Sequence, residues 1–423
     1  MDRAEERNET PTTGLGSWPT RVVRTLGLAI IHFFYRIRSV QTEHFPKQGG
    51  VLLLPNHISW ADAFFLTAAC PRPVRFVMEG SFMKNPLIRG FCKLFNTVPI
   101  TTGKPREALK IAADAIRKGD VVCIFPEGQL SRTGTLQELK RGCELIARLA
   151  GCPSVAVWSD GPWGSIFSFE GNRYFTKWPH RLPYRMHFAF APPLAPDEVS
   201  LEKIREVLLE TSTAALNDRI THSRWPEDRQ RDWINGYQLG QINALPRRRS
   251  FSILANDPEL IRLGALEGFA GLYRAKAEPD SDHEHWLGGD RLREHLETQT
   301  EPTGSRYFFD FGDMADEPFS KNGWQHLPCL AIDGIIVSMS APDPPKAHSS
   351  SPKQPGSREG SRGMLLPGFY PRAGKDGTFV IHGPAAGEEG IALPEGSRID
   401  ADGFIFLPCR TSPSSSELAR PDP

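Results

Sequence analysis

Short apolar runs alternate with longer amphipathic stretches through the first half of the chain. The apolar runs are too short for helices and are bounded by turn residues, so they predict buried strands. They lie at residues 51–55, 74–78, 98–100, 121–125, 154–158 and 186–190. The stretches with helical periodicity lie at residues 81–95, 107–118, 136–150 and 197–217. Strands that alternate with helices over residues 50–217 predict one α/β domain of ordinary size.

The segment before this domain is apolar but short. Residues 1–18 are polar and contain Pro and Gly, which predicts a disordered lead. Residues 21–38 contain an apolar segment of about ten residues flanked by arginines, shorter than the roughly 18–20 residues that span a bilayer. They lack a small-residue cleavage site, so we do not expect a signal peptide. The pattern favours an interfacial helix with arginines at the lipid headgroups; an ordinary core helix is the alternative.

Composition narrows the classes of function. The chain has 423 residues, enough for two domains, and carries 50 basic and 50 acidic side chains. This balance creates no overall field that would favour nucleic acid as a partner. The 7 cysteines are scattered and form no Cys-x-x-Cys pair, which indicates a reducing compartment. Cys123 lies inside an apolar strand and is expected to be a core residue rather than a nucleophile.

Asn56 and His57 directly follow the first apolar strand, at the point where the chain turns. Ser59 is expected to cap the next helix, with Asp62 in its first turn, close enough to reach back to His57. An imidazole titrates near neutral pH, and a carboxylate at its second nitrogen fixes the tautomer. His57 and Asp62 are therefore the candidate general base and its partner. The alternative is that Asp62 is only half of a capping box.

A second polar turn follows a later apolar strand. Phe125 and Pro126 lead into Glu127 and Gly128, and the Pro and Gly on either side of Glu127 predict a tight turn. Open α/β sheets place their ligands at the carboxyl ends of strands, where this turn is expected. Arg132 follows it, and its planar guanidinium suits a phosphate.

In this order, the His-(four residues)-Asp pattern and the Phe-Pro-Glu-Gly turn resemble the glycerophospholipid acyltransferase family, which includes 1-acylglycerol-3-phosphate and lysophospholipid acyltransferases. We assign residues 19–220 to such a domain. The resemblance implies a mixed sheet flanked by helices, a catalytic pair of His57 and Asp62, and no metal or redox cofactor. It also implies a set of substrate-binding residues around the two turns: Asn56, Phe125, Pro126, Glu127, Gly128, Ser131 and Arg132.

The chain departs from the family pattern in the region that holds the phosphate of the acceptor. After its third short strand the family has an arginine with that role, whereas this chain has Thr101 and Thr102. Lys104 and Arg106 are the candidate replacements as phosphate contacts, although a lysine does not reproduce a guanidinium fork. The alternative is that both belong to a solvated loop.

The second half of the chain has a weaker pattern. Residues 221–249 are polar and basic and predict a linker, and the composition of residues 341–362 predicts a flexible one. Segments within 356–406 are similar to the late part of AMP-forming acyl synthetases, but a competent phosphate loop is missing and no lid domain fits after Phe406. Residues 250–423 are interpreted as a smaller, irregular α+β region, a degenerate remnant of a synthetase.

The resemblance implies a reaction and its partners. It is strongest to the acyltransferase part of bacterial 2-acylglycerophosphoethanolamine acyltransferase/acyl carrier protein synthetase fusions. The implied O-acyltransferase moves a fatty acyl group from acyl-CoA or acyl carrier protein to the free hydroxyl of a lysophospholipid or 1-acylglycerol-3-phosphate. We expect it at the cytoplasmic face of a membrane, peripheral or monotopic, with no nucleic acid as partner. The alternatives are a catalytically silent membrane-surface binding protein and an AMP-forming acyl-activating ligase.

Overall fold

A computed structural model describes most of the first half of the chain and parts of the second. It covers residues 25, 27, 29, 31–79, 98–100, 105–177, 183–223, 230–241, 251–254, 285–286, 306–310, 324–344 and 354–408. The chain divides into two compact units. The first comprises residues 1–226 and 345–354, and the second comprises residues 227–344 and 355–423. The predicted boundary at residue 220 lies near the first of these divisions.

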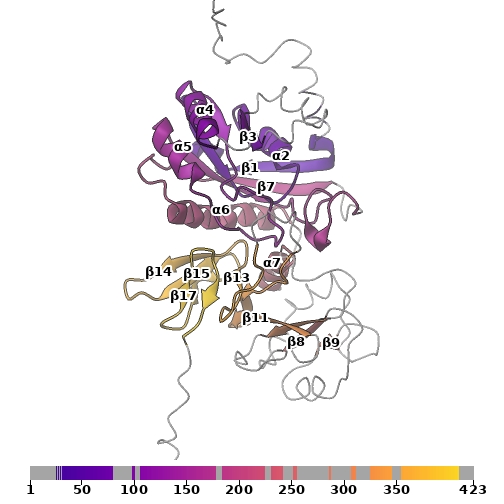
Figure 1. The fold of residues 1–423 in the computed structure, drawn as a ribbon. Helices are drawn as coiled ribbons and strands as arrows, with labels where there is room; N and C mark the ends of the chain where they lie inside the picture. Colours follow the sequence, from indigo (N-terminus) through magenta and orange to yellow (C-terminus); the bar gives the residue numbers. More distant parts are fainter. Residues whose placement is uncertain are drawn as a thin grey trace, which may run out of the picture. The chain divides into compact units, whose positions relative to one another are not determined.

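A seven-stranded sheet forms the centre of the first unit (Figure 1). Its strands are β1 (Tyr35–Val40), β2 (Val51–Pro55), β3 (Val74–Glu79), β4 (Val98–Ile100), β5 (Val121–Cys123), β6 (Ser154–Asp160) and β7 (Tyr184–Phe190). Their order is β1-β7-β6-β2-β5-β3-β4, and all neighbours are parallel except β6 and β7. This mixed sheet confirms the predicted α/β class.

Helices cover both faces of the sheet. They are α2 (Asp62–Ala69), α4 (Pro105–Arg117), α5 (Gly142–Ala150) and α6 (Leu201–Thr221), with short 3-10 turns at Thr42–His44 and Glu170–Asn172. Met186 and Phe188 of β7 pack in one core cluster with residues of α2. His187 lies between them and bonds to Asp218 of α6. Because successive strand residues point to opposite faces, α2 and α6 lie on opposite sides of the sheet.

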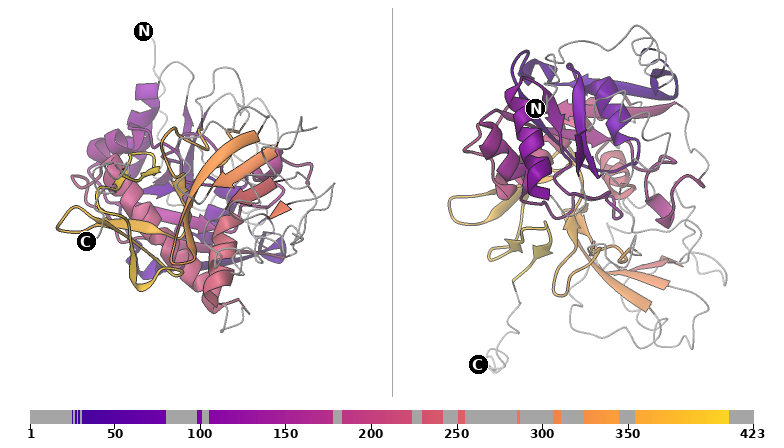
Figure 2. Two further views of the ribbon diagram at one scale, coloured as in Figure 1. Left: turned by 90° about the horizontal axis from the view of Figure 1, so that it is seen from below. Right: turned by 45° about the horizontal axis from the view of Figure 1, so that its top comes forward.

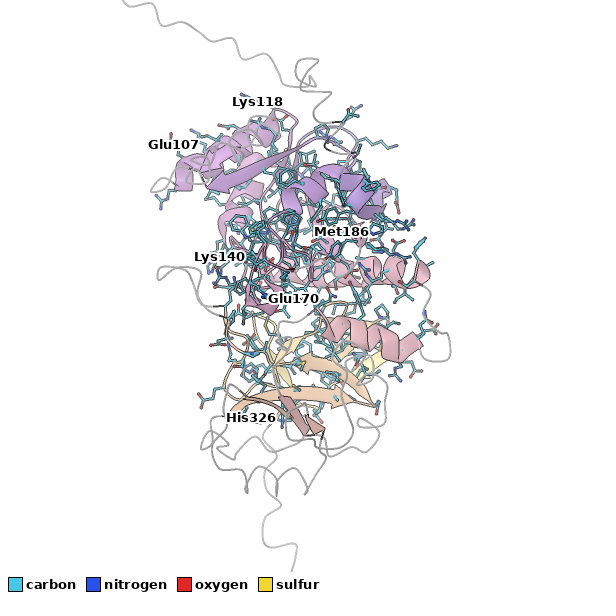
Figure 3. The ribbon with its side chains drawn as sticks, turned by 90° about the vertical axis from the view of Figure 1, so that its right-hand side faces the viewer. Glu107, Lys118, Lys140, Glu170, Met186 and His326 are labelled. Carbon is cyan, nitrogen blue, oxygen red and sulfur yellow. The ribbon has the colours of Figure 1, made fainter. Side chains whose placement is uncertain are left out.

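The amphipathic pattern of α4 places alanines inside and charges outside. Ala112 and Ala113 are buried, whereas Glu107 near its start and Lys118 just beyond its end are exposed (Figure 3). An acid at the first turn and a base after the last complement the helix dipole. The buried alanine face allows close packing, and α4 contacts the neighbouring α5 (Figure 1).

Two predicted helices differ in the structure. The helix predicted over residues 21–38 is wrong for its last part, because Tyr35–Val40 form β1 and pair in parallel with β7. Tyr35 stacks on Tyr184 of β7, with ring centroids 5.7 Å apart. The helix predicted to begin at residue 136 begins at Gly142 instead, because the preceding backbone is bonded elsewhere: the Lys140 N–H donates to the Pro126 carbonyl at 2.8 Å.

In its described residues, the second unit is mainly β-structure. It contains α7 (Gln230–Leu239), β8 (Phe251–Leu254), β9 (His285–Trp286), β10 (Arg306–Asp310), β11 (Trp324–Ile332), β12 (Ile335–Met339), β13 (Met364–Leu365), β14 (Tyr370–Ala373), β15 (Phe379–Gly383), β16 (Gly387–Ala392), β17 (Arg398–Ile399) and β18 (Ile405–Phe406). These strands form sheets of six, three and two strands; the three-stranded one, β14-β15-β16, is yellow in Figure 2.

Parts of both predicted linkers are ordered pieces of this unit. The predicted basic linker contains α7, whose buried Asn235 donates to the Ile336 carbonyl at 2.8 Å. Within the linker predicted as flexible, the Arg362 N–H donates to the Ile405 carbonyl at 2.7 Å, and Ser338 donates to the Arg362 carbonyl at 2.8 Å. Composition alone missed these partners, because they lie far away in the sequence.

Candidate active site

Three neighbouring parallel strands end at the same edge of the sheet. They are β6, β2 and β5, with β2 in the middle. The chain leaves β2 through Asn56 and His57, and it leaves β5 toward Phe125 and Glu127. Parallel neighbours bring their carboxyl ends together, so the two turns predicted from the sequence meet at this edge.

His57 and Asp62 form the contact that the sequence predicts. The imidazole Nδ1 lies 3.0 Å from Asp62 Oδ2. The Asp62 side chain is 1% exposed and that of His57 is 19% exposed. An ionised carboxylate only accepts hydrogen bonds, so the neutral imidazole is held in the tautomer with the proton on Nδ1 and the lone pair on Nε2. That arrangement equips Nε2 to remove a proton from an approaching hydroxyl.

Asp62 also organises the turn between β2 and α2. Its Oδ2 accepts from the backbone N–H groups of Ile58 at 2.7 Å and Ser59 at 2.9 Å. The prediction that Ser59 caps the helix is wrong, since α2 begins at Asp62 and the Ser59 hydroxyl accepts from the Ala61 N–H instead. The Ser59 N–H still donates to the Asp62 carboxylate three residues later, which is one of the two hydrogen bonds of a capping box. One carboxylate therefore fixes both the turn and the imidazole.

Glu127 links the two turns through the backbone. Its Oε1 accepts from the His57 N–H at 2.7 Å, and its Oε2 accepts from the Gln137 N–H at 2.9 Å. The side chain is completely buried. Burial raises the pKa of Glu127 to about 8, against the lowering effect of these two N–H donors and of the Arg205 charge. Glu127 therefore positions His57 and has no exposed atom with which to meet a substrate.

Several predicted substrate-binding residues are scaffold residues in the structure. Asn56 is buried, and its Oδ1 accepts from the backbone N–H of Ser159 at 2.7 Å and from the Ser159 hydroxyl at 2.9 Å. Ser131 is also buried, and its hydroxyl donates to the Thr135 carbonyl at 2.7 Å. Glu127 likewise has internal partners for both oxygens, and Pro126 is buried. These side chains therefore position the two turns, and their predicted role as substrate contacts stays a prediction.

The remaining predicted residues reach the surface. The Phe125 ring stacks on His57, with centroids 3.7 Å apart and planes 16° apart. Gly128 is exposed and has φ 67°, a left-handed conformation that glycine adopts most easily and that the tight turn requires. The Arg132 guanidinium lies 4.7 Å from the ring centroid of Phe169, a cation–π contact that holds it on one side of the turn.

Other residues at the site escaped sequence analysis. Gln137 and Ser159 complete the polar contacts of Glu127 and Asn56, and Phe169 holds Arg132. The sequence around Gln137, Ser159 and Phe169 gives no indication of these roles, because each residue acts only through a partner elsewhere in the chain. Of the two predicted phosphate contacts, Lys104 lies outside the described residues, and Arg106 is exposed in the first turn of α4. Their role stays a prediction.

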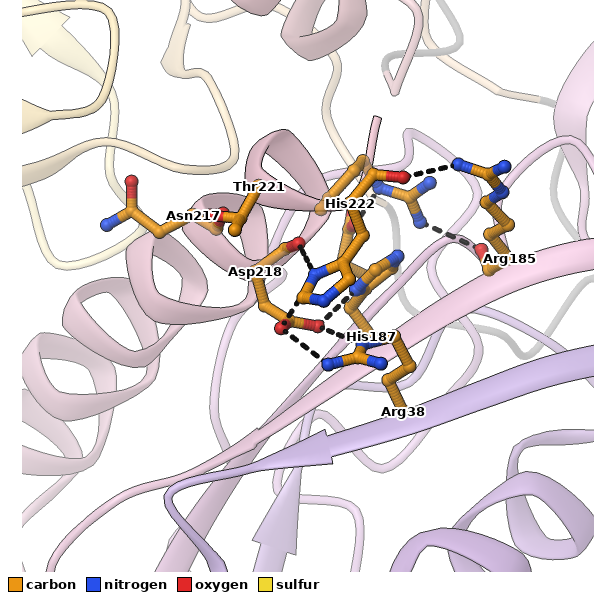
Figure 4. A network of polar contacts seen from close by, with 9 residues as sticks. Arg38, Arg185, His187, Asn217, Asp218, Thr221 and His222 are labelled. Carbon is orange, nitrogen blue, oxygen red and sulfur yellow. Dashed lines mark hydrogen bonds and ion pairs between the residues drawn. The ribbon is translucent and has the colours of Figure 1, made fainter. Parts of the chain in front are cut away.

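A second His–Asp pair lies on the opposite face of the sheet and has a different character. His187 Nδ1 lies 2.6 Å from Asp218 Oδ2, and Arg38 donates to the same oxygen at 3.1 Å (Figure 4). His187 Nε2 is buried and has no hydrogen-bond partner among the described residues. Burial, followed by the Arg219 charge, lowers the pKa of His187. This imidazole is closed to substrate, unlike that of His57.

Residues 36–160 match the protein-family model described as "Acyltransferase". The chain is 27% identical over 131 residues to "1-acyl-sn-glycerol-3-phosphate acyltransferase LPAT1, chloroplastic" of Arabidopsis thaliana, covering 30% of this chain and 36% of that protein. It is 28% identical over 144 residues to a Pseudomonas aeruginosa 1-acyl-sn-glycerol-3-phosphate acyltransferase, covering 33% of this chain and 52% of that protein. The chain thus spans only part of these relatives. The matched segment contains both turns of the site and supports the predicted O-acyltransferase.

Solved structures give weaker likenesses. The 1-acyl-sn-glycerophosphate acyltransferase PlsC of Thermotoga maritima has a TM-score of 0.38 and 19% identity, over 49% of this chain and 81% of that one. ATP-bound MatB of Rhodopseudomonas palustris has a TM-score of 0.24 and 11% identity, over 91% of this chain and 72% of that one. The similarity of the C-terminal region to AMP-forming synthetases therefore stays a prediction.

Proposed function

We propose that this protein is an O-acyltransferase that moves a fatty acyl group from acyl-CoA or acyl carrier protein to the free hydroxyl of a lysophospholipid or 1-acylglycerol-3-phosphate. The observation that carries the proposal is the His57–Asp62 contact of 3.0 Å, with a partly exposed imidazole above a buried carboxylate. It lies within the segment that matches acyltransferases.

The reaction carries one proton from the lipid hydroxyl to the departing thiolate by way of His57, in two transfers, and needs no covalent enzyme intermediate. His57 Nε2 removes the proton from the lipid hydroxyl as its oxygen attacks the thioester carbonyl. Asp62 holds the ring by Nδ1 and stabilises the imidazolium that forms. The tetrahedral intermediate collapses with release of the thiol, to which the imidazolium returns the proton. The described cysteines take no part; Cys123, for example, is buried in the core, as predicted.

Arg132 is the proposed contact for the phosphate of the acceptor. The relatives are named for a phosphate-bearing acceptor, 1-acyl-sn-glycerol-3-phosphate. Arg132 is partly exposed beside the turn that contacts His57, where it stacks on Phe169, and its planar guanidinium has the geometry that suits phosphate oxygens. Phe125 and Gly128 form the nearby surface against which the glycerol part would lie.

Aromatic side chains around the site favour a membrane surface as its location. Trp60 and Phe64 are each 40% exposed and Phe175 is 60% exposed, and the first two flank Asp62 in sequence. Among the described residues, no helix is long and apolar enough to cross a membrane. We propose peripheral or monotopic attachment at the cytoplasmic face, with these aromatic side chains at the headgroup level.

The test is acyl transfer from labelled acyl-CoA and acyl carrier protein to a panel of lysophospholipids and 1-acylglycerol-3-phosphate. We expect transfer by the unaltered protein and a loss of about 10²–10⁴-fold in kcat for His57→Ala, the range of a general base. Asp62→Asn is expected to cause a similar loss, because an amide does not stabilise the imidazolium.

His222→Ala is the matched control, since His222 is an exposed histidine at the end of α6, on the other face of the sheet. It should retain full activity. Undiminished transfer by the His57→Ala variant would show that His57 is not the general base. No transfer by the unaltered protein to any acceptor, together with binding to lipid vesicles, would favour the silent membrane-surface protein instead.

A further inference from the structure

A glutamine from far along the chain is hydrogen-bonded to the turn that carries Arg132. Gln354 Oε1 accepts from the Arg132 backbone N–H at 2.7 Å, and Gln354 Nε2 donates to the Leu130 carbonyl at 2.8 Å. Gln354 is 6% exposed. An amide side chain that pairs with a donor and an acceptor two residues apart fixes the main chain between them.

The same turn is joined to the catalytic pair on its other side. The Ser131 N–H donates to the His57 carbonyl at 2.8 Å. The three residues from Leu130 to Arg132 are therefore held by Gln354 at both ends and by His57 in the middle. Their backbone sets the direction in which the Arg132 side chain leaves the turn, and the contact with Phe169 holds its guanidinium further out.

We propose that Gln354 is a positioning residue for the acceptor side of the acyltransferase site, acting through the backbone of Arg132. The inference rests on the proposed function and adds to it a residue outside the matched segment 36–160. Gln354 meets no reacting atom. It keeps Arg132 directed toward the phosphate of a bound lysolipid. Loss of Gln354 should therefore weaken binding of the acceptor and leave binding of the acyl donor unchanged.

The place of Gln354 in the chain gives the second half of the sequence a role in this reaction. Residues 345–354 belong to the first compact unit, whereas residues 227–344 and 355–423 belong to the second. The chain thus leaves the second unit, supplies Gln354 to the acyltransferase unit and returns at Pro355. Even if the C-terminal region has no ligase activity, the acyltransferase site would still need it, because it supplies Gln354.

The experiment compares Gln354→Met with the unaltered full-length protein, because methionine keeps the length of the side chain and removes both hydrogen bonds. We expect the KM for 1-acylglycerol-3-phosphate to rise about fivefold or more, the effect of one net hydrogen bond. The kcat and the KM for acyl-CoA should stay within about twofold. In an Arg132→Ala background, Gln354→Met should raise the acceptor KM no further, because both changes remove the same contact.

Gln238→Met is the control for a merely structural effect. Gln238 is another buried glutamine, and it donates to the Pro367 carbonyl at 3.0 Å within the second unit. The Gln238→Met variant should have the same KM for the acceptor as the unaltered protein. An unchanged acceptor KM for Gln354→Met, a full additional rise in the Arg132→Ala background, or the same rise for Gln238→Met would each overturn the proposal.

A second measurement separates this inference from the proposed function. Amide hydrogen exchange at Arg132 should be faster in Gln354→Met than in the unaltered protein, whatever the protein catalyses. Unchanged exchange would overturn the contact itself. Faster exchange without acyl transfer by the unaltered protein would refute the proposed function and, with it, the acceptor role of Gln354, while leaving the contact established.

Discussion

At the scale of single residues, His57 is restrained by Asp62, Phe125 and Glu127, each acting on a different part of it, in addition to the Ser131 N–H at its carbonyl. Asp62 binds Nδ1 at 3.0 Å and fixes the tautomer. Phe125 stacks on the ring with centroids 3.7 Å apart and fixes its plane. Glu127 accepts the backbone N–H at 2.7 Å and fixes the main chain at the strand end. Together these contacts place Nε2 before any substrate arrives, which is what a general base requires.

Glu127 should make the stability of the protein depend on pH. Burial raises its pKa from 4.5 to about 8, so between these values the folded protein holds a proton that the unfolded chain has lost. This contribution to stability is fully present below about pH 4.5 and is lost as the pH rises toward about 8. Glu127→Gln removes the titration, so urea unfolding of the variant should change less with pH over this range.

The same variant should also be less stable at pH 5. At this pH Glu127 is protonated, and its two oxygens can still accept the two N–H groups, whereas the amide of the variant has a single acceptor oxygen, which should cost about 1–3 kcal/mol. Exposed Glu138→Gln is a suitable control and should leave both the stability and its pH dependence unchanged. A variant whose stability falls with pH as steeply as that of the unaltered protein would show that Glu127 is not the group responsible.

At the scale of elements, one carboxylate joins three pieces of the first unit. Asp218 of α6 bonds to Arg38 of the edge strand β1 and to His187 of β7 (Figure 4). On the same face, Arg219 of α6 forms an ion pair with Asp160 of β6 and donates to the Arg185 carbonyl at 2.9 Å. These contacts fasten α6 to the face of the sheet opposite α2.

This network should weaken in acid because of His187. Burial and the Arg219 charge lower its pKa below 6.5, despite the opposing effects of Asp160 and Asp218. The unfolded chain therefore binds the proton first, and stability is lost as the pH falls below about 6.5. His187→Gln keeps a donor for Asp218 and removes the titration, so its melting temperature should fall less between pH 7 and pH 5.

His222→Gln serves as the comparison for this prediction. His222 contacts the same carboxylate, at 3.2 Å, but its side chain is 40% exposed whereas that of His187 is 1% exposed, so the acid sensitivity of the protein should be retained in this variant. Equal acid sensitivity in His187→Gln and the unaltered protein would assign the effect to another group.

The elements that the sequence predicts correctly are those that local pattern determines. Strands such as β2 and β6 are continuous apolar runs buried on both faces, and a short apolar run between turns is sufficient to find them. β1 was missed because its apolar residues resemble a helix, and only pairing with β7 makes them a strand. The start of α5 was missed because the backbone before Gly142 bonds to the Glu127 turn.

At the scale of the whole molecule, the residues of the site that could be predicted are those set by local sequence, and the residues that were missed are those that depend on distant contacts. His57 and Asp62 are five residues apart and were found from one turn, and the Glu127 turn was found from its Pro and Gly. Ser159 and Gln354 reach the site across 103 and 222 residues, and nothing near them in sequence marks them. Their contacts exist only once the sheet has assembled.

The C-terminal half should have no adenylating activity. Its sequence lacks a competent phosphate loop, which adenylation of a fatty acid requires. With ATP, Mg²⁺, a fatty acid and CoA, the full-length protein should release pyrophosphate no faster than a protein-free blank, whereas it should transfer acyl groups from preformed acyl-CoA. ATP-dependent pyrophosphate release that survives His57→Ala would restore the ligase alternative. Transfer without pyrophosphate release would leave this half with the role that Gln354 indicates, support of the acceptor site.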